Sequence, residues 1–325
     1  MTFENDVKAV DALKDSYNKI LCEIKKVIIG QDDVVKSTLI SIFSGGHCLL
    51  VGVPGLAKTL LVNTIANTLG LEYSRIQFTP DLMPSDIIGS EILNDKREFK
   101  FVKGPVFANI ILADEINRTP PKTQSALLEA MQEKSVTISG NKNKLPNPFF
   151  VLATQNPIEQ EGTYPLPEAQ LDRFMFMINL NYPSLDDEIA IVSETTSSKS
   201  VEISSVITAD ELIYFQQLVR RIPVNDNVVR YAVNVTAKTR PNTQYAADIT
   251  NQYLTWGAGP RASQYLILGA KTHAAINGKY SPDIDDVKAI AELVLKHRIV
   301  RNYKAEAEGI SDNDIILEIL KSVKY

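Results

Sequence analysis

The clearest chemical signal in this sequence is a short run with two glycines, a lysine and a hydroxyl at fixed spacing. The run reads Gly52-Val53-Pro54-Gly55-Leu56-Ala57-Lys58-Thr59. It follows an apolar stretch and opens a helical pattern, which is the context that a phosphate-binding loop needs. Backbone N–H groups of such a loop point at phosphate oxygens, and the positive end of the next helix adds to the attraction. Lys58 can reach the β and γ phosphates and the Thr59 hydroxyl can bind Mg²⁺, so the run predicts a site for ATP and Mg²⁺.

Ala57 stands where this pattern usually has its last glycine. Alanine is the smallest residue with a Cβ, and helical backbone angles remain available to it. We therefore expect a small cost, provided that the position needs no positive φ. The alternative interpretation is a glycine turn that only joins a strand to a helix.

Two carboxylates end a second apolar stretch, because Ile110 to Ala113 leads directly into Asp114 and Glu115. Open α/β sheets bind ligands at the carboxyl ends of their strands. Beside a phosphate loop, Asp114 is predicted to hold Mg²⁺ and Glu115 to position and polarise the attacking water, since phosphoryl transfer needs positioning and charge stabilisation. Without the loop, the same pair would indicate only a helix N-cap.

A polar amide follows a third apolar stretch, at Asn156 in Ala153-Thr154-Gln155-Asn156-Pro157. An amide at a strand end can hold the water or the γ-phosphate. Asn-Pro is also a common start of a turn. The spacing alone leaves both interpretations open.

These three groups must be positioned by the elements around them. Short apolar segments separated by helical patterns favour a parallel sheet covered on both faces. The predicted strands are 48–51, 109–113 and 149–154, and the helix from Lys58 is expected to end near Gly70. Residues 92–102 and 136–145 each indicate a hairpin. Apolar residues on one face between Val10 and Val27 predict an N-terminal helix.

The pattern changes near Pro183, where strand signals vanish and helix-capping signals appear. Residues with capping spacing, and a Ser-Pro start, occur at Thr208 with Glu211, Ser311 with Asp314, and Ser281-Pro282. We therefore expect an α/β nucleotide-binding domain over residues 1–183 and an all-helical domain over residues 184–325.

Composition narrows the classes of function. The chain has 325 residues, of which 44% are hydrophobic and 22% charged, with a formal charge of -5. This is ordinary for a globular protein and gives no global attraction to nucleic acid or anionic membrane. Cys22 and Cys48 form no CxxC motif or cluster with histidine, which favours a reducing cytoplasm. The polar N-terminus does not resemble a signal peptide, and no apolar run approaches the roughly 18–20 residues of a membrane helix, so no direct membrane insertion is expected.

The motifs together resemble the MoxR group of AAA+ ATPases over about residues 25–325. The matching runs are 51–59 with its alanine before the lysine, 114–133, 153–157 and 161–174. The resemblance implies a parallel-sheet α/β sandwich with hairpin insertions, followed by a helical lid. It implies nucleotide-binding residues from Gly52 through Leu60, and an adenine-contacting loop that includes Ile29 and Gly30.

The resemblance also implies roles that spacing did not show. Asn156 matches the residue called sensor 1, and Arg173 matches the arginine finger that reaches the ATP of a neighbouring subunit. Arg261, in the run 257–262, matches sensor 2 on the lid. Outside these motifs, both arginines would be interpreted as solvated or ion-paired.

The implied function is Mg²⁺-dependent ATP hydrolysis by a hexameric ring. Such ATPases remodel or help to mature protein complexes, acting on a protein client with a separate partner that carries a von Willebrand factor A domain. One alternative is a DNA-acting motor that uses the basic hairpin residues Lys96, Arg97, Lys100, Lys103, Lys142 and Lys144. The acidic charge and the lack of a recognisable DNA-binding module weigh against it.

Two further alternatives remain. In a small-molecule kinase, Glu115, Asn156 and Arg173 together would have no clear place. In a scaffold that binds ATP but barely hydrolyses it, the intact Glu115 would be unexpected.

Overall fold

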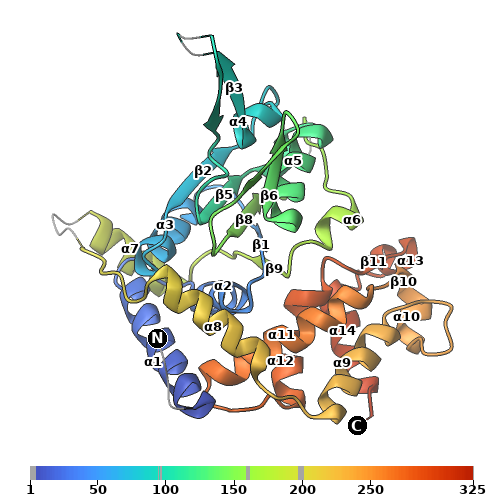
Figure 1. Cartoon of the computed structure of the whole chain (residues 1–325). Helices are drawn as coiled ribbons and strands as arrows, with labels where there is room; N and C mark the ends of the chain where they lie inside the picture. Colours follow the sequence, from blue (N-terminus) through green and yellow to red (C-terminus); the bar gives the residue numbers. More distant parts are fainter. Residues whose placement is uncertain (1–4, 94, 96, 159–161, 197–200, 325) are drawn as a thin grey trace. The chain divides into compact units, whose positions relative to one another are not determined.

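The computed structural model describes residues 5–93, 95, 97–158, 162–196 and 201–324 (Figure 1). The chain divides into two compact units. An α/β unit comprises Ser16–Arg173 and Ile178–Ile213, and a helical unit comprises Met1–Asp15, Phe174–Met177 and Tyr214–Tyr325. The boundary near Pro183 that the sequence suggests lies within the α/β unit, and a functional division there stays a prediction.

A five-stranded sheet has the order β2-β5-β8-β1-β9; the α/β unit contains β2, β5, β8, β1 and the last two residues of β9. Its pairs β2–β5, β5–β8 and β1–β8 are parallel. The strands are β1 (Cys48–Val51), β2 (Tyr73–Gln77), β5 (Ile110–Asp114), β8 (Phe150–Gln155) and β9 (Phe176–Asn179). Because Val51 pairs with Gln155 and Gln77 with Asp114, the carboxyl ends of four strands meet at one edge of the sheet.

The three strands predicted from apolar runs are confirmed, because their side chains form the centre of the core. Leu49 and Leu50 of β1, Ile111 and Leu112 of β5, and Val151 and Leu152 of β8 are fully buried. The sequence did not reveal β2 and β9. Strand β2 lies at the edge of the sheet and buries only Ile76, so it has no apolar run, and β9 has only four residues.

Helices alternate with the strands along the chain, and α3 packs against β2 and β5. The predicted N-terminal helix is confirmed as α1, whose buried face includes Leu13, Tyr17 and Ile20. The helices up to residue 221 are α1 (Asp6–Lys25), α2 (Asp32–Ser44), α3 (Lys58–Thr68), α4 (Pro84–Ile88), the 3-10 helix η1 (Ile116–Arg118), α5 (Pro121–Glu133), α6 (Glu168–Leu171), α7 (Leu185–Thr195) and α8 (Ala209–Arg221).

Both predicted hairpins are confirmed. Strand β3 (Gly89–Leu93) pairs antiparallel with β4 (Phe99–Lys103), and β6 (Ser135–Ile138) pairs antiparallel with β7 (Asn141–Lys144). The β3–β4 hairpin projects away from the central sheet (Figure 1). The two hairpins are joined where Ser139 Oγ donates to Glu91 Oε2 at 2.7 Å. Lys96 of the predicted basic cluster lies outside the described residues.

The helical unit packs its remaining helices around a core that includes Tyr231, Leu266, Ile290 and Ile315. Its elements after α8 are α9 (Asp226–Lys238), α10 (Asp248–Tyr253), β10 (Leu254–Trp256), α11 (Pro260–Ile276), α12 (Ile284–Leu295), β11 (Val300–Arg301), α13 (Tyr303–Ala307) and α14 (Asp312–Ser322). The expectation that strands are absent here was incomplete, because β10 pairs antiparallel with β11. Strands of three and two residues are too short to give a periodic signal.

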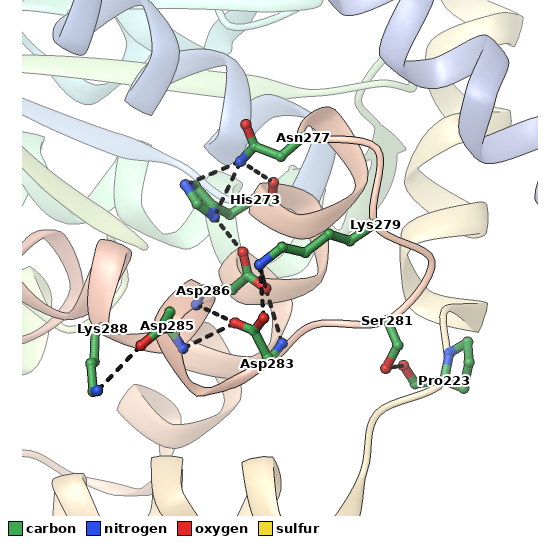
Figure 2. Close-up of polar contacts among 9 residues, drawn as sticks. All are labelled: Pro223, His273, Asn277, Lys279, Ser281, Asp283, Asp285, Asp286 and Lys288. Carbon is green, nitrogen blue, oxygen red and sulfur yellow. Dashed lines mark hydrogen bonds and ion pairs between the residues drawn. The ribbon is translucent and has the colours of Figure 1, made fainter.

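The predicted helix start at Ser281-Pro282 is wrong (Figure 2). Helix α12 begins after Asp283, whose carboxylate accepts from the backbone N–H groups of Asp285 at 3.0 Å and Asp286 at 3.1 Å. The Asp286 carboxylate in turn accepts from the Asp283 N–H at 2.9 Å, which completes a capping box. Ser281 Oγ instead donates to the Pro223 carbonyl at 3.2 Å.

Candidate nucleotide-binding site

The loop from Gly52 to Ala57 connects β1 to α3 at the carboxyl edge of the sheet. Its first residue is fixed to the neighbouring strand, because the Gly52 N–H donates to the Gln155 carbonyl at 3.2 Å. Lys58 Nζ donates to the Gly52 carbonyl, which folds the lysine back over the loop. Gly55 has φ +87° and open space where a Cβ would stand. The backbone at Gly55 is therefore accessible to a ligand.

The small cost expected for alanine at position 57 depended on the absence of a positive φ there, and this condition is not met. It has φ 53° and ψ 28°, in the left-handed region, immediately before the first residue of α3. For a residue with a Cβ, this conformation costs about 1–2 kcal/mol. The loop therefore holds a strained alanine at the N-terminus of the helix that would face the phosphates.

Lys58 is a half-buried cation that faces two carboxylates. Burial lowers its pKa from the ordinary value, while Asp114 and Glu115 act in the opposite direction and favour the charged form. The lysine of the loop and the two acidic residues at the end of β5 thus belong to one electrostatic group.

Thr154 connects the two acidic residues to the adjacent strand. Its hydroxyl donates to Asp114 Oδ1 at 2.7 Å and accepts from the Glu115 N–H at 2.8 Å. Glu115 has φ 58°, so the chain turns sharply as it leaves β5. The hydroxyl therefore fixes both the Asp114 carboxylate and the main chain that carries Glu115.

Three other side chains that the sequence did not reveal hold the same carboxylates. Arg75 NH2 lies 2.6 Å from Asp114 Oδ2. Glu115 Oε2 accepts from Gln77 Nε2 at 3.0 Å and lies 3.1 Å from Arg118 Nε. Arg75 and Gln77 come from β2, and only the strand order could have placed them beside β5.

Asn156 follows β8 and is almost completely buried, with 6% exposure. Its Oδ1 accepts from the Ile158 N–H at 3.2 Å, so it also forms the turn that Asn-Pro predicted. Because β8 lies between β1 and β5, Asn156 reaches the same sheet edge as the loop and the carboxylates. The role as sensor 1 stays a prediction.

A cavity of about 380 Å³ opens beside the loop within the α/β unit. The predicted nucleotide-binding residues in its wall are Ile29, Gly55, Leu56, Ala57 and Leu60, and the sequence missed Pro183, Ile191, Glu194, Thr195 and Val201. The missed residues come from α7 and its flanks, which carry no motif. Most of the named residues are apolar, which suits the faces of a planar base.

One residue of the cavity wall, Gln31, has a buried amide oxygen without a partner among the described residues. Its Nε2 donates to the Leu56 carbonyl at 3.2 Å. A buried amide oxygen normally has a donor, but this oxygen has no exposed surface from which a ligand could reach it. The mostly apolar wall of the cavity is the feature that fits the base of an adenine nucleotide.

Gly30 does not line the cavity but shapes the segment that does. It has φ +72°, and a Cβ there would lie 2.6 Å from the Asp187 Cγ. Only glycine fits this close approach without displacing Asp187. Gly30 therefore lets the segment at Ile29 pass close to α7, which also lines the cavity.

Arg173 lies outside this cavity. Its Nε donates to Gln132 Oε1 at 3.1 Å and its NH1 donates to the Ala169 carbonyl at 3.0 Å. It lines a separate cavity of about 520 Å³ together with Glu129, Glu133 and other residues, none of which lines the first cavity. Arg261 belongs to the helical unit, in the first turn of α11. The roles of both arginines stay predictions.

The predicted Mg²⁺ residues are Thr59, exposed at the start of α3, and Asp114, at the end of β5. Among the described residues, no group of three or more His, Cys, Asp or Glu side chains could hold a metal ion. One hydroxyl and one carboxylate nevertheless fit Mg²⁺, which is usually held by few protein ligands together with substrate phosphates and water.

In the described part of the chain, no helix is long and apolar enough to span a bilayer.

Comparison with known proteins shows the family of the chain. The family described as "ATPase family associated with various cellular activities (AAA)" matches residues 47–176, and the AAA lid domain matches residues 246–319. Chaperone MoxR1 of Mycobacterium tuberculosis is 44% identical over 94% of this chain and 81% of its own length. The chain belongs to the MoxR family of AAA+ ATPases.

Other relatives have similar lengths. The MoxR-family chain is 42% identical to the uncharacterized protein YeaC of Bacillus subtilis, over 94% of this chain and 93% of YeaC. A crystal structure of a candidate ATPase from Cytophaga hutchinsonii superposes with a TM-score of 0.91 at 44% identity and covers 98% of this chain and 97% of that one. The predicted AAA+ fold with a lid is therefore confirmed.

Proposed function

We propose that this MoxR-family chain binds ATP with Mg²⁺ and hydrolyses it within a ring of identical subunits. The observation that carries the proposal is the meeting of the loop lysine Lys58, the carboxylates of Asp114 and Glu115, and the amide of Asn156 at one edge of the sheet. The cavity beside this edge is lined mostly by apolar residues, which suits the faces of adenine. One unit of the chain would thereby supply the positions of the base, the phosphates and the water.

Each side chain has one task in this mechanism. The N–H groups of the loop and Lys58 would bind the β and γ phosphates, and Thr59 with Asp114 would hold Mg²⁺, which neutralises phosphate charge when bound. Glu115 would orient a water molecule toward the γ-phosphate and polarise it. Gln77 and Arg118 both contact Glu115 Oε2, at 3.0 and 3.1 Å, and so orient the carboxylate, whose other oxygen Oε1 would accept from the water.

Arg173 would act on a neighbouring subunit. It lines a cavity that shares no residue with the nucleotide cavity of its own chain. A contact in which one surface offers the finger and a different surface offers the nucleotide is head-to-tail, and such contacts close into rings when the rotation permits. We infer a hexamer from the family, with Arg261 of the lid as sensor 2.

The work of the ring would be the remodelling or maturation of protein complexes, together with a separate protein that carries a von Willebrand factor A domain. A relative is named a chaperone. The β3–β4 hairpin exposes apolar side chains, including Phe99 at 75% and Leu93 at 57%. Exposed apolar side chains favour a polypeptide client over the phosphate backbone of DNA, although Lys100 and Lys103 lie on the same hairpin.

Two variants separate binding from hydrolysis. Lys58→Ala should abolish binding of a fluorescent ATP analogue, while Glu115→Gln should bind it and release no phosphate. Turnover by Glu115→Gln near the parent rate would refute Glu115 as the residue that positions water.

Two measurements test the alternative functions. Double-stranded and single-stranded DNA should not stimulate the ATPase activity of the parent protein. Phosphate release without any added acceptor excludes a kinase.

The trans finger is tested by mixing two inactive variants, Arg173→Ala and Glu115→Gln. Where the first supplies the ATP site and the second supplies the finger, both required residues are intact. Activity should therefore return once subunits exchange. An arginine finger contributes about 10³–10⁵ in rate, so the parent should also lose specific activity on dilution. If exchange is demonstrated, no activity returns, and the parent is insensitive to dilution, Arg173 is not a trans finger.

A further inference from the structure

Arg298, just beyond α12, is a buried arginine that the function so far leaves unused. It is only 6% exposed. Its NH2 donates to the Phe174 carbonyl at 2.6 Å, and its NH1 donates to the Met175 carbonyl at 3.3 Å and also to the Val294 carbonyl. One planar guanidinium therefore binds the consecutive carbonyls of Phe174 and Met175, just before β9, to the last turn of α12.

His297 contributes to the same contact. It is also 6% exposed, and its Nε2 lies 3.0 Å from the Phe174 carbonyl oxygen. Two adjacent side chains at the end of α12 thus meet one peptide group. Buried main-chain carbonyls need partners, but a helix or a strand normally supplies them. Here the charged side chain of a residue far away in the sequence does so.

The segment that is held in this way begins at the residue after the predicted finger. Phe174–Met177 belongs to the helical unit, whereas the chain up to Arg173 belongs to the α/β unit. The Arg173 N–H donates to the Gln170 carbonyl at 3.1 Å, inside the α/β unit. The point where the chain passes from one unit to the other is therefore the peptide bond between Arg173 and Phe174.

Arg298 also contacts the helix that carries the predicted sensor 2. Its Cζ lies 5.1 Å from the centroid of the Tyr265 ring, a cation–π contact. Tyr265 lies on α11, about one turn after Arg261. Within the helical unit, a single side chain thus contacts both α11 and the main chain that adjoins the finger.

We propose that Arg298 is a positioning residue for the arginine finger, which ties the main chain that follows Arg173 to the lid helix that carries Arg261. The proposal rests on the trans role of Arg173 proposed above. Arg298 would touch neither nucleotide nor water. It sets the place from which Arg173 projects, so its loss should impair hydrolysis at the neighbouring subunit's site and leave nucleotide binding in its own subunit intact.

The variant for the test is Arg298→Lys, because lysine keeps the charge but cannot span two carbonyls with a planar fork. Arg301→Lys is the matched control. Arg301 lies in the same unit and donates from NH1 to the Ile310 carbonyl at 2.9 Å, away from residues 174–177. A misplacement of about 1 Å can cost about 10²-fold in rate. We expect kcat of Arg298→Lys to fall by about that factor with KM for ATP nearly unchanged, and Arg301→Lys to keep the parent kcat.

Mixing shows on which side of the interface the defect acts. Arg298→Lys mixed with Glu115→Gln should regain activity, because the first supplies an intact ATP site and the second an intact finger. Arg298→Lys mixed with Arg173→Ala should not, because both lack a working finger. If Arg298 instead acted through its own lid, the outcomes would be reversed. That reversal would overturn the proposal.

The mixture of Arg173→Ala with Glu115→Gln serves as the reference in the same experiment. When it regains activity, the trans finger holds and the Arg298 mixtures decide the inference alone. When it regains none despite demonstrated exchange, the trans finger fails and the inference fails with it. The two failures are therefore distinguishable.

A second variant covers the case in which Arg298→Lys does not fold, as shown by loss of cooperative unfolding. Tyr265→Leu removes the ring against which Arg298 packs and leaves its contacts with Phe174 and Met175. A fall of kcat by about 10-fold, restored by Glu115→Gln but not by Arg173→Ala, supports the proposal. A parent-like kcat, or restoration by Arg173→Ala alone, contradicts it.

Discussion

The hydroxyl of Thr154 donates to the carboxylate of Asp114 at 2.7 Å, across the boundary between β8 and β5. The same oxygen accepts from the Glu115 N–H at 2.8 Å. One side chain of a neighbouring strand therefore orients the proposed Mg²⁺ carboxylate and fixes the main chain of the proposed water-positioning residue. Substitution of Thr154 therefore tests the geometry of both acidic residues at once.

Thr154→Val keeps the shape of the side chain but removes the hydroxyl. We expect ATP turnover to fall by about 10–100-fold, as for other partners that orient metal-binding groups. The free energy of unfolding should fall by about 1–3 kcal/mol, because the buried Glu115 N–H loses its acceptor. Turnover and urea denaturation measure the two effects.

Thr236→Val is the matched control for this prediction. Its buried hydroxyl donates to the Ala232 carbonyl at 3.0 Å within α9, in the helical unit. It should alter stability without lowering turnover per folded molecule. Equal losses of turnover in both variants would show that Thr154 acts only through stability.

Ala57→Gly should stabilise the fold. Glycine adopts a φ of 53° without the strain of a Cβ, which offsets its larger entropy in the unfolded chain. We expect a gain of up to about 1 kcal/mol in the free energy of unfolding. The same change at Ala126, inside α5, should cost about 1 kcal/mol instead. A loss of stability at both positions would refute the strain at Ala57.

The buried His47 should make the protein sensitive to acid. Its Nδ1 accepts from the Val151 N–H at 3.0 Å, and its Nε2 lies 3.3 Å from the Met131 carbonyl oxygen. Burial lowers the pKa of His47 from 6.5 to about 4. Between these values the unfolded chain binds the proton and the folded chain does not, so stability is full above about pH 6.5 and falls as the pH drops to about 4.

The contribution of His47 to this loss is about 3 kcal/mol, from a shift of this size. His47→Gln should therefore flatten the dependence of the unfolding free energy on pH between 6.5 and 4. Urea denaturation at several pH values measures the slope. Part of the slope should remain, because burial also holds the pKa of His297 well below its ordinary value. An unchanged slope in the variant would mean that His47 is not kept neutral by the fold.

Asp283→Ala should weaken the start of α12 (Figure 2). Loss of an N-cap typically costs about 1 kcal/mol. The Lys279 side chain holds the pKa of Asp283 at about 2, below its ordinary 3.8, so the difference between parent and variant should shrink as the pH falls from about 4 to 2. Asp285→Ala, two residues further along the chain at a side chain that is 83% exposed, should change stability by less than about 0.5 kcal/mol. Equal effects of the two substitutions at pH 7 would argue against the cap.

The sequence predicted the parts of the site that lie next to an apolar strand. Strands β1, β5 and β8 are buried on both faces, so each gives a continuous apolar run, and the functional residue stands where the run ends. The phosphate loop, Asp114 with Glu115, and Asn156 could all be found by this rule. The prediction of a helix start at Ser281 shows the limit of this rule. Asp283 and Asp286 have capping spacing too, and only the tertiary structure shows that Asp283 caps α12 while Ser281 contacts Pro223.

Residues that act across the sheet or from a distant segment could not be found in this way. Arg75 and Gln77 reach the carboxylates only because the edge strand β2 pairs with β5, and β2 has no apolar run. Ile191 and Thr195 line the nucleotide cavity through the path of α7, which no motif marks. Arg298 contacts Phe174 over a separation of 124 positions. Each of these contacts depends on tertiary packing rather than on local pattern.

The burial of β1 makes the thiol of Cys48 a probe for opening of the sheet. Cys48 is fully buried in this interior strand, and burial raises the pKa of its thiol to about 12, whereas Cys22 is exposed on α1. Only a thiolate reacts readily with alkylating reagents. A single equivalent of label should therefore mark Cys22 in the folded protein. The rate at which a second label appears on Cys48 would measure how often β1 becomes exposed. This strand leads into the loop that is proposed to hold the phosphates.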